Sequence, residues 1–261
     1  GYVNATGNSD VSTLNLGEKL AWKPATSKFS LDQYAKYVYG KTDGEEHHVA
    51  LLLIFEILEV ASRADLKSDL LQELERQKQV LEALRDNPDI SEEALENVLW
   101  QIDQSSSRLF QASGKVGQEI RENEWLMSIK QRTAIPGGVC EFDLPSYHFW
   151  LQQETDLRRH DLQQWLAPFL PTRDAICIVL RLLRESGKSS AQVAQQGVYQ
   201  QMMAGRMAQM LRIGLAGDHA CVPEISANKY ALNIRFTTQE GMQRPKALER
   251  DVEFELTFCN L

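Results

Sequence analysis

The sequence predicts an α+β protein, in which an N-terminal, mostly helical domain packs against a C-terminal, mainly antiparallel β domain. Apolar residues recur at helical spacing through most of the region before Gly187, and short alternating segments follow it. With 261 residues, of which 43% are hydrophobic and 25% charged, the chain can bury a substantial core. The expected organisation is a loop or disordered stretch over 1–28, a helical domain over 29–136 and 148–187, and a β domain over 137–147 and 189–261.

Each helix has its own sequence signal. The capping box Ser30-Leu-Asp-Gln33 predicts a short helix, and the strongly apolar run from His48 to Arg63 favours a buried one. Leucines repeat on one stripe from Asp65 to Asp86, which indicates an amphipathic helix. Ser91 is a good N-cap for the next helix, and we expect a further helix from about Glu119 to Arg132.

The second half of the chain mixes both patterns. Ile135-Pro-Gly-Gly breaks the helical region, and Val139 to Phe142 is expected to form a strand that joins the β domain. Residues 155–166 and 172–185 predict two more helices. The strands expected after them are Gln192–Gln201, Met210–Ala216, Lys229–Thr237 and Asp251–Cys259. The last strand alternates cleanly, so one of its faces is expected to be buried and the other wet.

Charge and cysteine usage exclude several classes of protein. The net charge is −8, and the stretch from Lys41 to Glu96 contains 15 acidic and only 6 basic residues. This excess of negative charge argues against a nucleic-acid-binding surface. No apolar run is long enough to span a bilayer, and the N-terminus lacks the build of a signal peptide. The four cysteines stand singly, as expected in a reducing compartment. We therefore expect a cytoplasmic protein with no membrane insertion and no nucleic-acid partner.

Three motifs could suggest chemistry, and each has a simpler explanation. Gly187-Lys-Ser189 resembles the end of a phosphate-binding loop, but Leu182 stands where that loop needs glycine, so a helix stop is favoured. Cys140 and His148 could be a nucleophile and its base, although a buried structural cysteine fits the pattern better. Glu45-Glu-His-His48 offers metal ligands that do not converge on one helix face. We expect no cofactor, no metal and no enzymatic activity.

Two other groups of residues bear on binding. The aromatic cluster of Tyr147, Phe149, Trp150 and Trp165 is expected to be core. Basic residues flank the helix expected before the junction and fall on candidate strands. They are Arg121, Lys130, Arg132, Arg212, Lys229 and Arg235. Spacing alone does not gather these residues, because Arg121 and Lys130 do not share a face of a straight helix.

The stretch Ile135-Pro-Gly-Gly-Val-Cys-Glu-Phe-Asp-Leu-Pro-Ser-Tyr-His-Phe-Trp-Leu151 closely resembles the I-P-G-G-x-C-x-F-D-L-P-x-x-H-x-W-L signature of the ZapD family of cell-division proteins. Further resemblances follow the family order, in Leu70 to Gln77, Lys130 to Arg132, Pro223 to Phe236 and Asp251 to Leu256. The resemblance covers roughly residues 50 to 261.

The resemblance implies a cytoplasmic homodimer, recruited to mid-cell, with a helical and a β domain. Such proteins bind the C-terminal tail of FtsZ, the tubulin-like division GTPase, and crosslink its filaments into bundles that stabilise the Z ring. The candidate partner contacts that follow are Arg121, Lys130, Arg132, His148, Arg212, Lys229 and Arg235.

Several positions depart from the family pattern. Relatives carry R-E-D-R before the signature, whereas this chain has Arg121-Glu-Asn-Glu124, and I-S-G-H-K is replaced by Ile225-Ser-Ala-Asn-Lys229. These changes motivate a second hypothesis, a dimeric interaction scaffold of the same fold with a different partner. An enzyme that uses Cys140 and His148 is the third.

Overall fold

The computed structural model divides the chain into two compact units. One comprises Thr26–Val179, and the other comprises Gly1–Ala25 together with Leu180–Leu261. The residues that the structure describes are 11–12, 42–61, 66–112, 114–204, 208–216, 221–228, 230–238 and 244–261. The short helix expected after Ser30 and most of the stretch 1–28 lie outside these residues. Within that stretch, Val11–Ser12 form strand β1.

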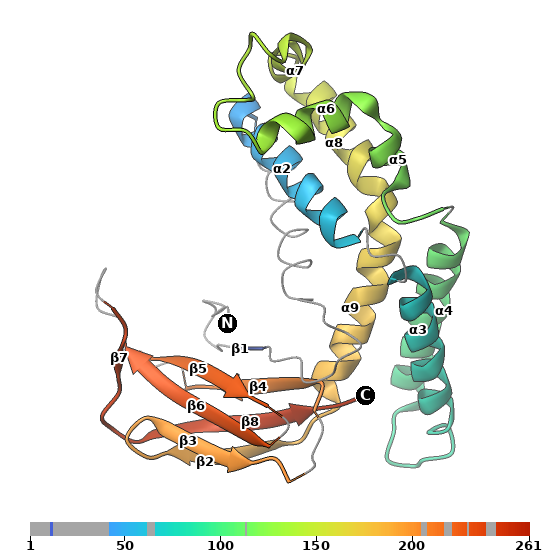
Figure 1. Cartoon of the computed structure of the whole chain (residues 1–261). Coiled ribbons are helices and arrows are strands. Elements are labelled where there is room, and N and C mark those ends of the chain that lie inside the picture. Colours follow the sequence, from blue (N-terminus) through green and yellow to red (C-terminus); the bar gives the residue numbers. More distant parts are fainter. Residues whose placement is uncertain are drawn as a thin grey trace. The chain divides into compact units, whose positions relative to one another are not determined.

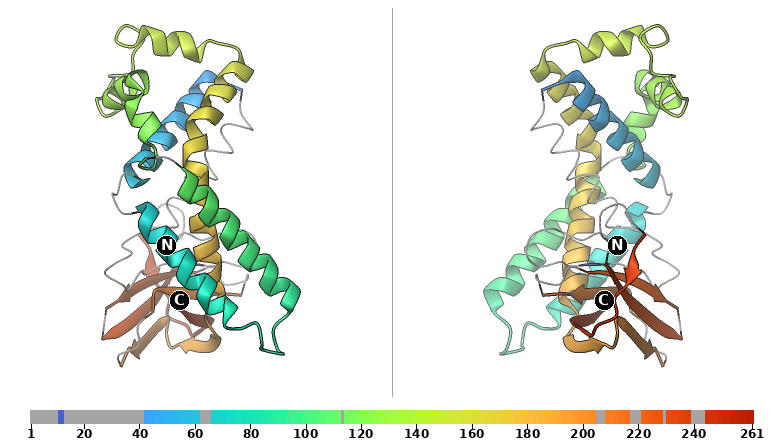
Figure 2. Two further views of the ribbon diagram at one scale, coloured as in Figure 1. Left: turned by 90° about the vertical axis from the view of Figure 1, so that its right-hand side faces the viewer. Right: turned by 90° about the vertical axis from the view of Figure 1, so that its left-hand side faces the viewer.

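The first unit is helical (Figure 1). Its elements are α2 (Gly44–Ala61), α3 (Leu66–Glu82), α4 (Glu92–Gln111), α5 (Gln118–Glu122), α6 (Glu124–Thr133), α7 (Pro145–Leu151), α8 (Thr155–Leu166), the 3-10 turn η1 (Ala167–Phe169) and most of α9 (Leu170–Glu185). The apolar helix α2 packs against α6, α7 and α8, and its residues Leu51 and Ile54 are fully buried. Helices α3 and α4 form a hairpin, which both views of Figure 2 show.

The expected helix from Glu119 to Arg132 is in fact two helices. Asn123 ends α5 and caps α6, because its side-chain Oδ1 accepts a hydrogen bond from the Leu126 amide at 3.0 Å. Ser91 caps α4 in the predicted way, through a hydrogen bond from the Ala94 amide at 3.3 Å. The prediction of one helix from Glu119 to Arg132 is therefore wrong, whereas the predicted cap at Ser91 is confirmed.

The predicted strand from Val139 to Phe142 is wrong. These residues form successive turns, which are closed by hydrogen bonds from Gly138 N to Ile135 O at 2.8 Å and from Leu144 N to Cys140 O at 3.1 Å. Gly137 reverses the chain with a φ of 73°. The backbone therefore bonds to itself rather than to a sheet, and residues 137–147 lie within the unit Thr26–Val179.

The second unit is a β-sandwich of antiparallel strands. Sheet A has the order β1-β4-β8-β2 and sheet B the order β3-β6-β5, with β7 beside β6. The strand bounds are β2 Ser189–Ala194, β3 Val198–Met202, β4 Met210–Gly214, β5 Val222–Ala227, β6 Ala231–Thr238, β7 Lys246–Ala247 and β8 Val252–Cys259. Alternate residues of both sheets, such as Leu256, Phe254 and Phe236, fill one core. The α+β fold class, with antiparallel strands in the C-terminal part, is confirmed.

The single strand expected over Gln192–Gln201 is a hairpin. A two-residue turn at Gln196 and Gly197, with φ values of 48° and 73°, separates β2 from β3. A Cβ atom at position 197 would lie 2.3 Å from the Leu248 carbonyl oxygen, so the turn requires glycine there.

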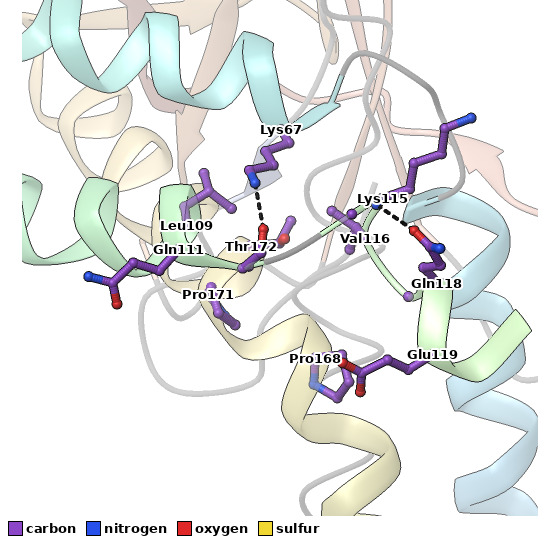
Figure 3. Close-up of a pocket in the computed structure, with 13 residues that line it drawn as sticks. Lys67, Leu109, Gln111, Lys115, Val116, Gln118, Glu119, Pro168, Pro171 and Thr172 are labelled. Atoms are coloured by element: carbon purple, nitrogen blue, oxygen red, sulfur yellow. Dashed lines mark hydrogen bonds between the residues drawn. The ribbon is translucent and has the colours of Figure 1, made fainter. Parts of the chain in front are cut away.

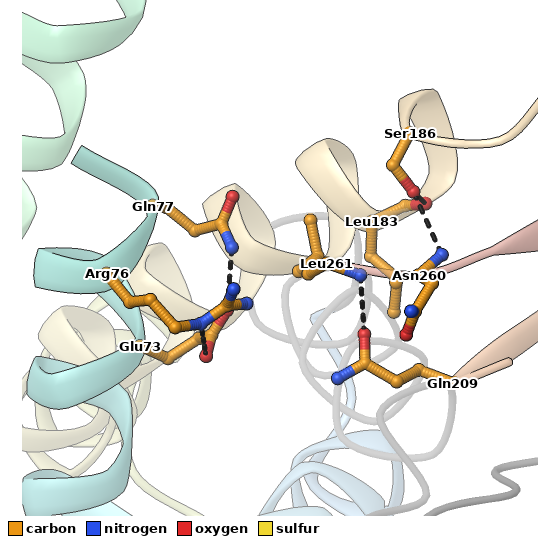
Figure 4. A network of polar contacts seen from close by, with 8 residues as sticks. All are labelled: Glu73, Arg76, Gln77, Leu183, Ser186, Gln209, Asn260 and Leu261. Carbon is orange, nitrogen blue, oxygen red and sulfur yellow. Dashed lines mark hydrogen bonds and ion pairs between the residues drawn. The ribbon is translucent and has the colours of Figure 1, made fainter. Parts of the chain in front are cut away.

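Side chains form two local hydrogen-bond networks, both of which are drawn in Figure 4. In the β unit, Ser186 Oγ accepts from the Asn260 amide at 3.1 Å, and Gln209 Oε1 accepts from the Leu261 amide at 2.7 Å. In the helical unit, Glu73 accepts from Arg76 Nε at 3.0 Å and from Gln77 Nε2 at 2.8 Å. These bonds hold the last residues of the sandwich and order one face of α3.

Candidate partner-binding surface

Residues 132–151, here called the signature segment, lie at the end of the helical unit that is far from the α3–α4 hairpin (Figures 1 and 2). Two predicted contact residues hold its loop in place. Arg132 Nη1 lies 3.3 Å from Asp143 Oδ2, and His148 Nε2 donates to the Val139 carbonyl oxygen at 2.8 Å. The loop is thereby tied to the end of α6 on one side and to α7 on the other.

Three apolar side chains of the signature segment face solvent. Phe142 is 94% exposed, Phe149 69% and Ile135 51%. Several exposed aromatic and apolar side chains in one short segment are typical of protein-binding surfaces. The sequence analysis missed them, and it placed Phe149 in the core. Their signal was present, because a segment broken by proline and glycine has no regular period with which to bury every apolar residue.

Two other members of the predicted aromatic cluster, Tyr147 and Trp150, are core as predicted, and Trp165 is half-buried. Tyr147 and Trp150 of α7 are buried, with ring centroids 6.0 Å apart, and Trp150 lies 5.5 Å from Trp165 of α8. Trp125 of α6 joins them and donates from Nε1 to Ser146 Oγ at 3.0 Å. The cluster gives the exposed loop a rigid base.

A histidine of α2 contacts this base. His48 Nδ1 is hydrogen-bonded to the Tyr147 hydroxyl. Burial lowers the pKa of His48, and the nearby His148 lowers it further, whereas burial raises the pKa of the Tyr147 phenol. The two histidines therefore lie close enough to interact electrostatically, His48 on α2 and His148 in the signature segment.

Arg121 and Lys130 lie on either side of the break at Asn123, and both contact α2. Lys130 forms an ion pair with Glu59 of α2, and Arg121 donates to the carbonyl oxygens of Val116 at 3.2 Å and Leu58 at 3.4 Å. The hydrogen bond from Lys130 lowers the pKa of Glu59, and the charge of Arg121 adds to this effect. Two bases that could not share a face of one straight helix thus approach successive residues of α2.

The remaining candidates belong to the β unit. Arg212 is half-buried on β4 in sheet A, where its partner residue on β8 is Thr257. Arg235 is exposed on β6 in sheet B, directly opposite Glu224 of β5. Lys229 lies outside the described residues. Within this unit the structure does not gather Arg212 and Arg235 into one patch.

The motifs set aside in the sequence have structural explanations. Helix α9 ends at Glu185 and β2 begins at Ser189, so Gly187 lies in a helix-to-strand connection. Cys140 is exposed rather than buried, and its Sγ lies 3.5 Å from Asp143 Oδ2, while His148 Nε2 is bonded to a carbonyl.

Among the described residues, no three potential ligands come together to hold a metal ion. The described part of the chain also has no helix that could cross a membrane.

A cavity of about 280 Å³ lies beside the end of α4 and the start of α9 (Figure 3). Lys67 projects into it and donates to the carbonyl oxygens of Ala112 at 2.6 Å and Phe110 at 3.2 Å. Its ammonium group thus caps the carboxyl end of α4, where the helix dipole favours a cation. On its other side, Gln118 Oε1 accepts from the Lys115 amide at 3.2 Å. These contacts stabilise the connection between α4 and α5.

The similarity of this chain to known proteins extends well beyond the signature segment. The model of the ZapD family, described as a cell division protein, matches residues 30–235. The Cell division protein ZapD of Azoarcus sp. (strain BH72) is 62% identical over 216 residues, which are 83% of this chain and 86% of that protein. Its namesake from Dechloromonas aromatica (strain RCB) is 58% identical over 233 residues, or 88% of this chain and 92% of that protein. The one from Chromobacterium violaceum is 56% identical over 224 residues, 85% and 89% respectively.

Proposed function

Because this chain belongs to the ZapD family of cell division proteins, we propose that it binds the C-terminal tail of FtsZ and, as a homodimer, crosslinks FtsZ filaments into bundles. In this role it acts in the cytoplasm, is recruited to mid-cell and stabilises the Z ring. The proposal rests on family membership for the partner and on the signature segment for the place of contact.

The observation that carries the proposal is the pairing of exposed aromatic rings with cations in the signature segment. Phe142 and Phe149 offer apolar anchors, and Arg132 of the same segment is ion-paired with Asp143, the residue that follows Phe142 in the sequence. Peptide sites commonly combine such anchors with a few charged contacts, which give steering and orientation. A short tail peptide therefore has both kinds of contact available here.

The ion pairs of this surface can be exchanged. Arg132 is paired with Asp143, and Lys130 with Glu59, and each pair includes an exposed side chain. Exposed pairs contribute only about 0–1 kcal/mol, so a carboxylate of the peptide can replace the internal acid at little cost. Arg121 and His148 bond to backbone carbonyls, and we assign them the role of holding the surface in shape as well as contacting the tail. Arg212, Lys229 and Arg235 remain candidate contacts of the β unit.

The first test is fluorescence anisotropy with a labelled FtsZ tail peptide at about 0.1 M and about 1 M salt, where Debye lengths are about 10 and 3 Å. Replacing Arg132 and His148 together by alanine should weaken binding about tenfold or more at the lower salt, because charge-assisted hydrogen bonds are lost. The matched control is Arg85→Ala, which removes an exposed arginine paired with Glu96 on the α3–α4 hairpin. Equal affinities of the double variant and the control at low salt would remove both residues from the site.

The second function, a scaffold with another partner, is favoured by one substitution. Where relatives carry the second arginine of R-E-D-R, Glu124 begins α6, and an acid in the first turn of a helix stabilises that helix. The position thus serves the helix and offers no cation to an acidic peptide. A folded, dimeric sample that fails to bind the tail peptide at either salt concentration would support this second function instead.

A further inference from the structure

The side chain of Arg158 is a buried cation without an acidic partner. Arg158 lies on α8 and is only 5% exposed, and no ion pair joins it to an acid among the residues that the structure describes. Buried arginines are almost always paired, because a charge that leaves water loses its hydration. The surroundings of Arg158 therefore decide what this charge can bind.

The protein itself fixes one corner of the guanidinium group. Arg158 Nη2 donates to the Thr42 carbonyl oxygen at 2.8 Å and to Thr155 Oγ1 at 3.3 Å, and Thr155 Oγ1 donates to the same carbonyl oxygen at 3.1 Å. Nε and Nη1 are buried as well, but neither has a hydrogen-bond partner among the described residues. The N–H donors on Nε and Nη1 therefore remain available in a fixed orientation.

These donors lie beside the start of α2. A Cβ atom on Gly44, the first residue of α2, would lie 3.1 Å from Arg158 Nη1 and 2.8 Å from the Leu151 carbonyl oxygen. Glycine permits this close approach, because even a methyl group would meet the guanidinium and the backbone of α7. The first amides of a helix carry a partial positive charge, so the start of α2 and Arg158 repel each other unless an anion lies beside both.

We propose that Arg158 and the first turn of α2 form a binding site for one carboxylate group. A carboxylate at this place accepts hydrogen bonds from the guanidinium and lies at the positive end of the helix dipole, so it neutralises both positive charges at once. Neither Arg158 nor the start of α2 is a partner contact in the proposed function, and the site does not depend on that function.

The charges around the site favour a carboxylate over a phosphate. Asp43 precedes α2, and Glu45 and Glu46 lie in its first turn. Asp43 Oδ1 accepts from the Glu45 amide at 3.3 Å, so this acid caps the helix and does not bond to Arg158. A carboxylate carries a single charge and balances the arginine, whereas a phosphate carries more charge and is repelled more strongly by the three acids.

A ligand reaches the site through local opening at the surface. Thr42, whose carbonyl oxygen binds Arg158, is exposed, and so is Asp43. The ends of helices open at low cost in free energy. Leu151 is the last residue of the signature segment, so the carboxylate can belong to a peptide bound on that segment or to a free small acid. Both sources present the same group, and the experiment separates them.

Thermal unfolding of the full chain during titration with sodium acetate tests the site, with sodium chloride keeping the ionic strength constant. Acetate should raise Tm saturably by about 2 °C or more, because a ligand that binds only the folded state stabilises it. Arg158→Lys keeps the charge but loses the guanidinium donors, and it should abolish the rise. Arg159→Lys is the matched control and should retain it, since Arg159 is the next residue of α8 and pairs with Asp156 at 3.4 Å.

Two further measurements complete the test. A short capped peptide with one aspartate is titrated in the same way. Half of its effect at a lower concentration than acetate assigns the carboxylate to a peptide, and half at an equal or higher concentration assigns it to a free small acid. If Arg158→Lys does not fold, NMR of the wild-type protein decides, because the Nε–H signal of Arg158 should move and saturate with acetate.

The outcomes that would overturn the site are distinct from those that bear on the proposed function. An equal rise of Tm in Arg158→Lys and the wild type would overturn the site, as would an Nε–H signal that acetate leaves unchanged. A saturable rise that is larger with phosphate than with acetate would overturn the choice of carboxylate. None of these results touches the binding of the FtsZ tail peptide, which the Arg132 and His148 variants test separately.

Discussion

Two of the proposed contact residues in the signature segment also hold its loop in place. Arg132 and His148 hold the loop through Asp143 and the Val139 carbonyl, so their loss changes the shape of the surface as well as its charge. The side chain of Phe142 does not hold the loop in this way, because 94% of it is exposed. The residue that best separates binding from stability is therefore Phe142.

We predict that Phe142→Ser leaves the free energy of unfolding within about 0.5 kcal/mol of wild type, since an exposed side chain contributes little to folding. The same change should weaken binding of the FtsZ tail peptide several-fold through loss of an apolar anchor. Urea denaturation and anisotropy measure the two effects. Phe110→Ser on α4 is the control, because Phe110 is an equally apolar ring that is 74% exposed. A similar loss of binding in both variants would contradict a role specific to Phe142.

His48 makes stability depend on pH. Burial and His148 hold its pKa below the ordinary value of 6.5, so the unfolded chain takes up the proton first as the pH falls. The stabilising contribution of neutral His48 is therefore complete above about pH 6.5 and is lost progressively below it. His48→Gln should reduce the loss of unfolding free energy between about pH 7.5 and 5.5, measured by urea denaturation. His160→Gln on α8 is the comparison, and an identical flattening in that variant would argue against His48.

At the scale of elements, the periodicity of apolar residues predicted most helices and strands, but it did not predict the short breaks between them. Helices α2, α3, α4, α8 and α9 follow from apolar spacing, and β8 follows from alternation. The break at Asn123 was missed because the helix-forming residues on both sides continue the pattern across it. The turn at Gln196 was missed because glutamine rarely adopts a positive φ. Four residues of alternation at Val139–Phe142 were too few to distinguish a strand from successive turns.

The cap at Asn123 gives a prediction for α6. Asn123→Ala removes the acceptor of the Leu126 amide and should lower the free energy of unfolding by about 1 kcal/mol. Asn123→Asp keeps an acceptor at the same place and should remain close to wild type. Thermal denaturation followed by circular dichroism compares the three proteins. An aspartate variant as unstable as the alanine variant would mean that the amide, rather than the cap, is required.

Two glycines with the same backbone conformation should respond differently to alanine. Gly137 and Gly197 both have a φ of 73°, but an added Cβ meets nothing within 4 Å at Gly137 and lies 2.3 Å from Leu248 O at Gly197. Gly137→Ala should therefore cost only the conformational strain, about 1 kcal/mol, whereas Gly197→Ala adds a backbone clash and should cost about 3 kcal/mol. Equal costs in urea denaturation would show that the β2–β3 turn can move away from Leu248.

At the scale of the whole molecule, the sequence predicted the class of fold but only part of the candidate site. Arg132 and His148 were available from the family resemblance, whereas the exposure of Phe142 and Phe149 depends on how the loop is closed. The approach of Arg121 and Lys130 to α2 likewise needed the unforeseen break between α5 and α6. Residues that meet through tertiary packing cannot be identified from spacing along one element.

A bivalent crosslinker predicts an optimum in filament bundling. Bundles need one dimer to hold two tails, so light scattering of FtsZ filaments should rise with added protein, pass a maximum and fall when each tail binds its own dimer. An excess of tail peptide should abolish scattering throughout the titration. A curve that rises to a plateau and stays there would contradict crosslinking by two equivalent sites.

The exposed cysteine of the signature segment also offers a direct optical readout. Cys140 is exposed two residues before Phe142, whereas Cys177 and Cys221 are half-buried and Cys259 is buried. Burial raises the thiol pKa of Cys221 and Cys259, which leaves them less reactive at neutral pH. A thiol-reactive fluorophore should therefore label the wild-type chain selectively at Cys140. The fluorescence emission of the label would then change when a ligand binds to the signature segment, and no residue would need to be engineered.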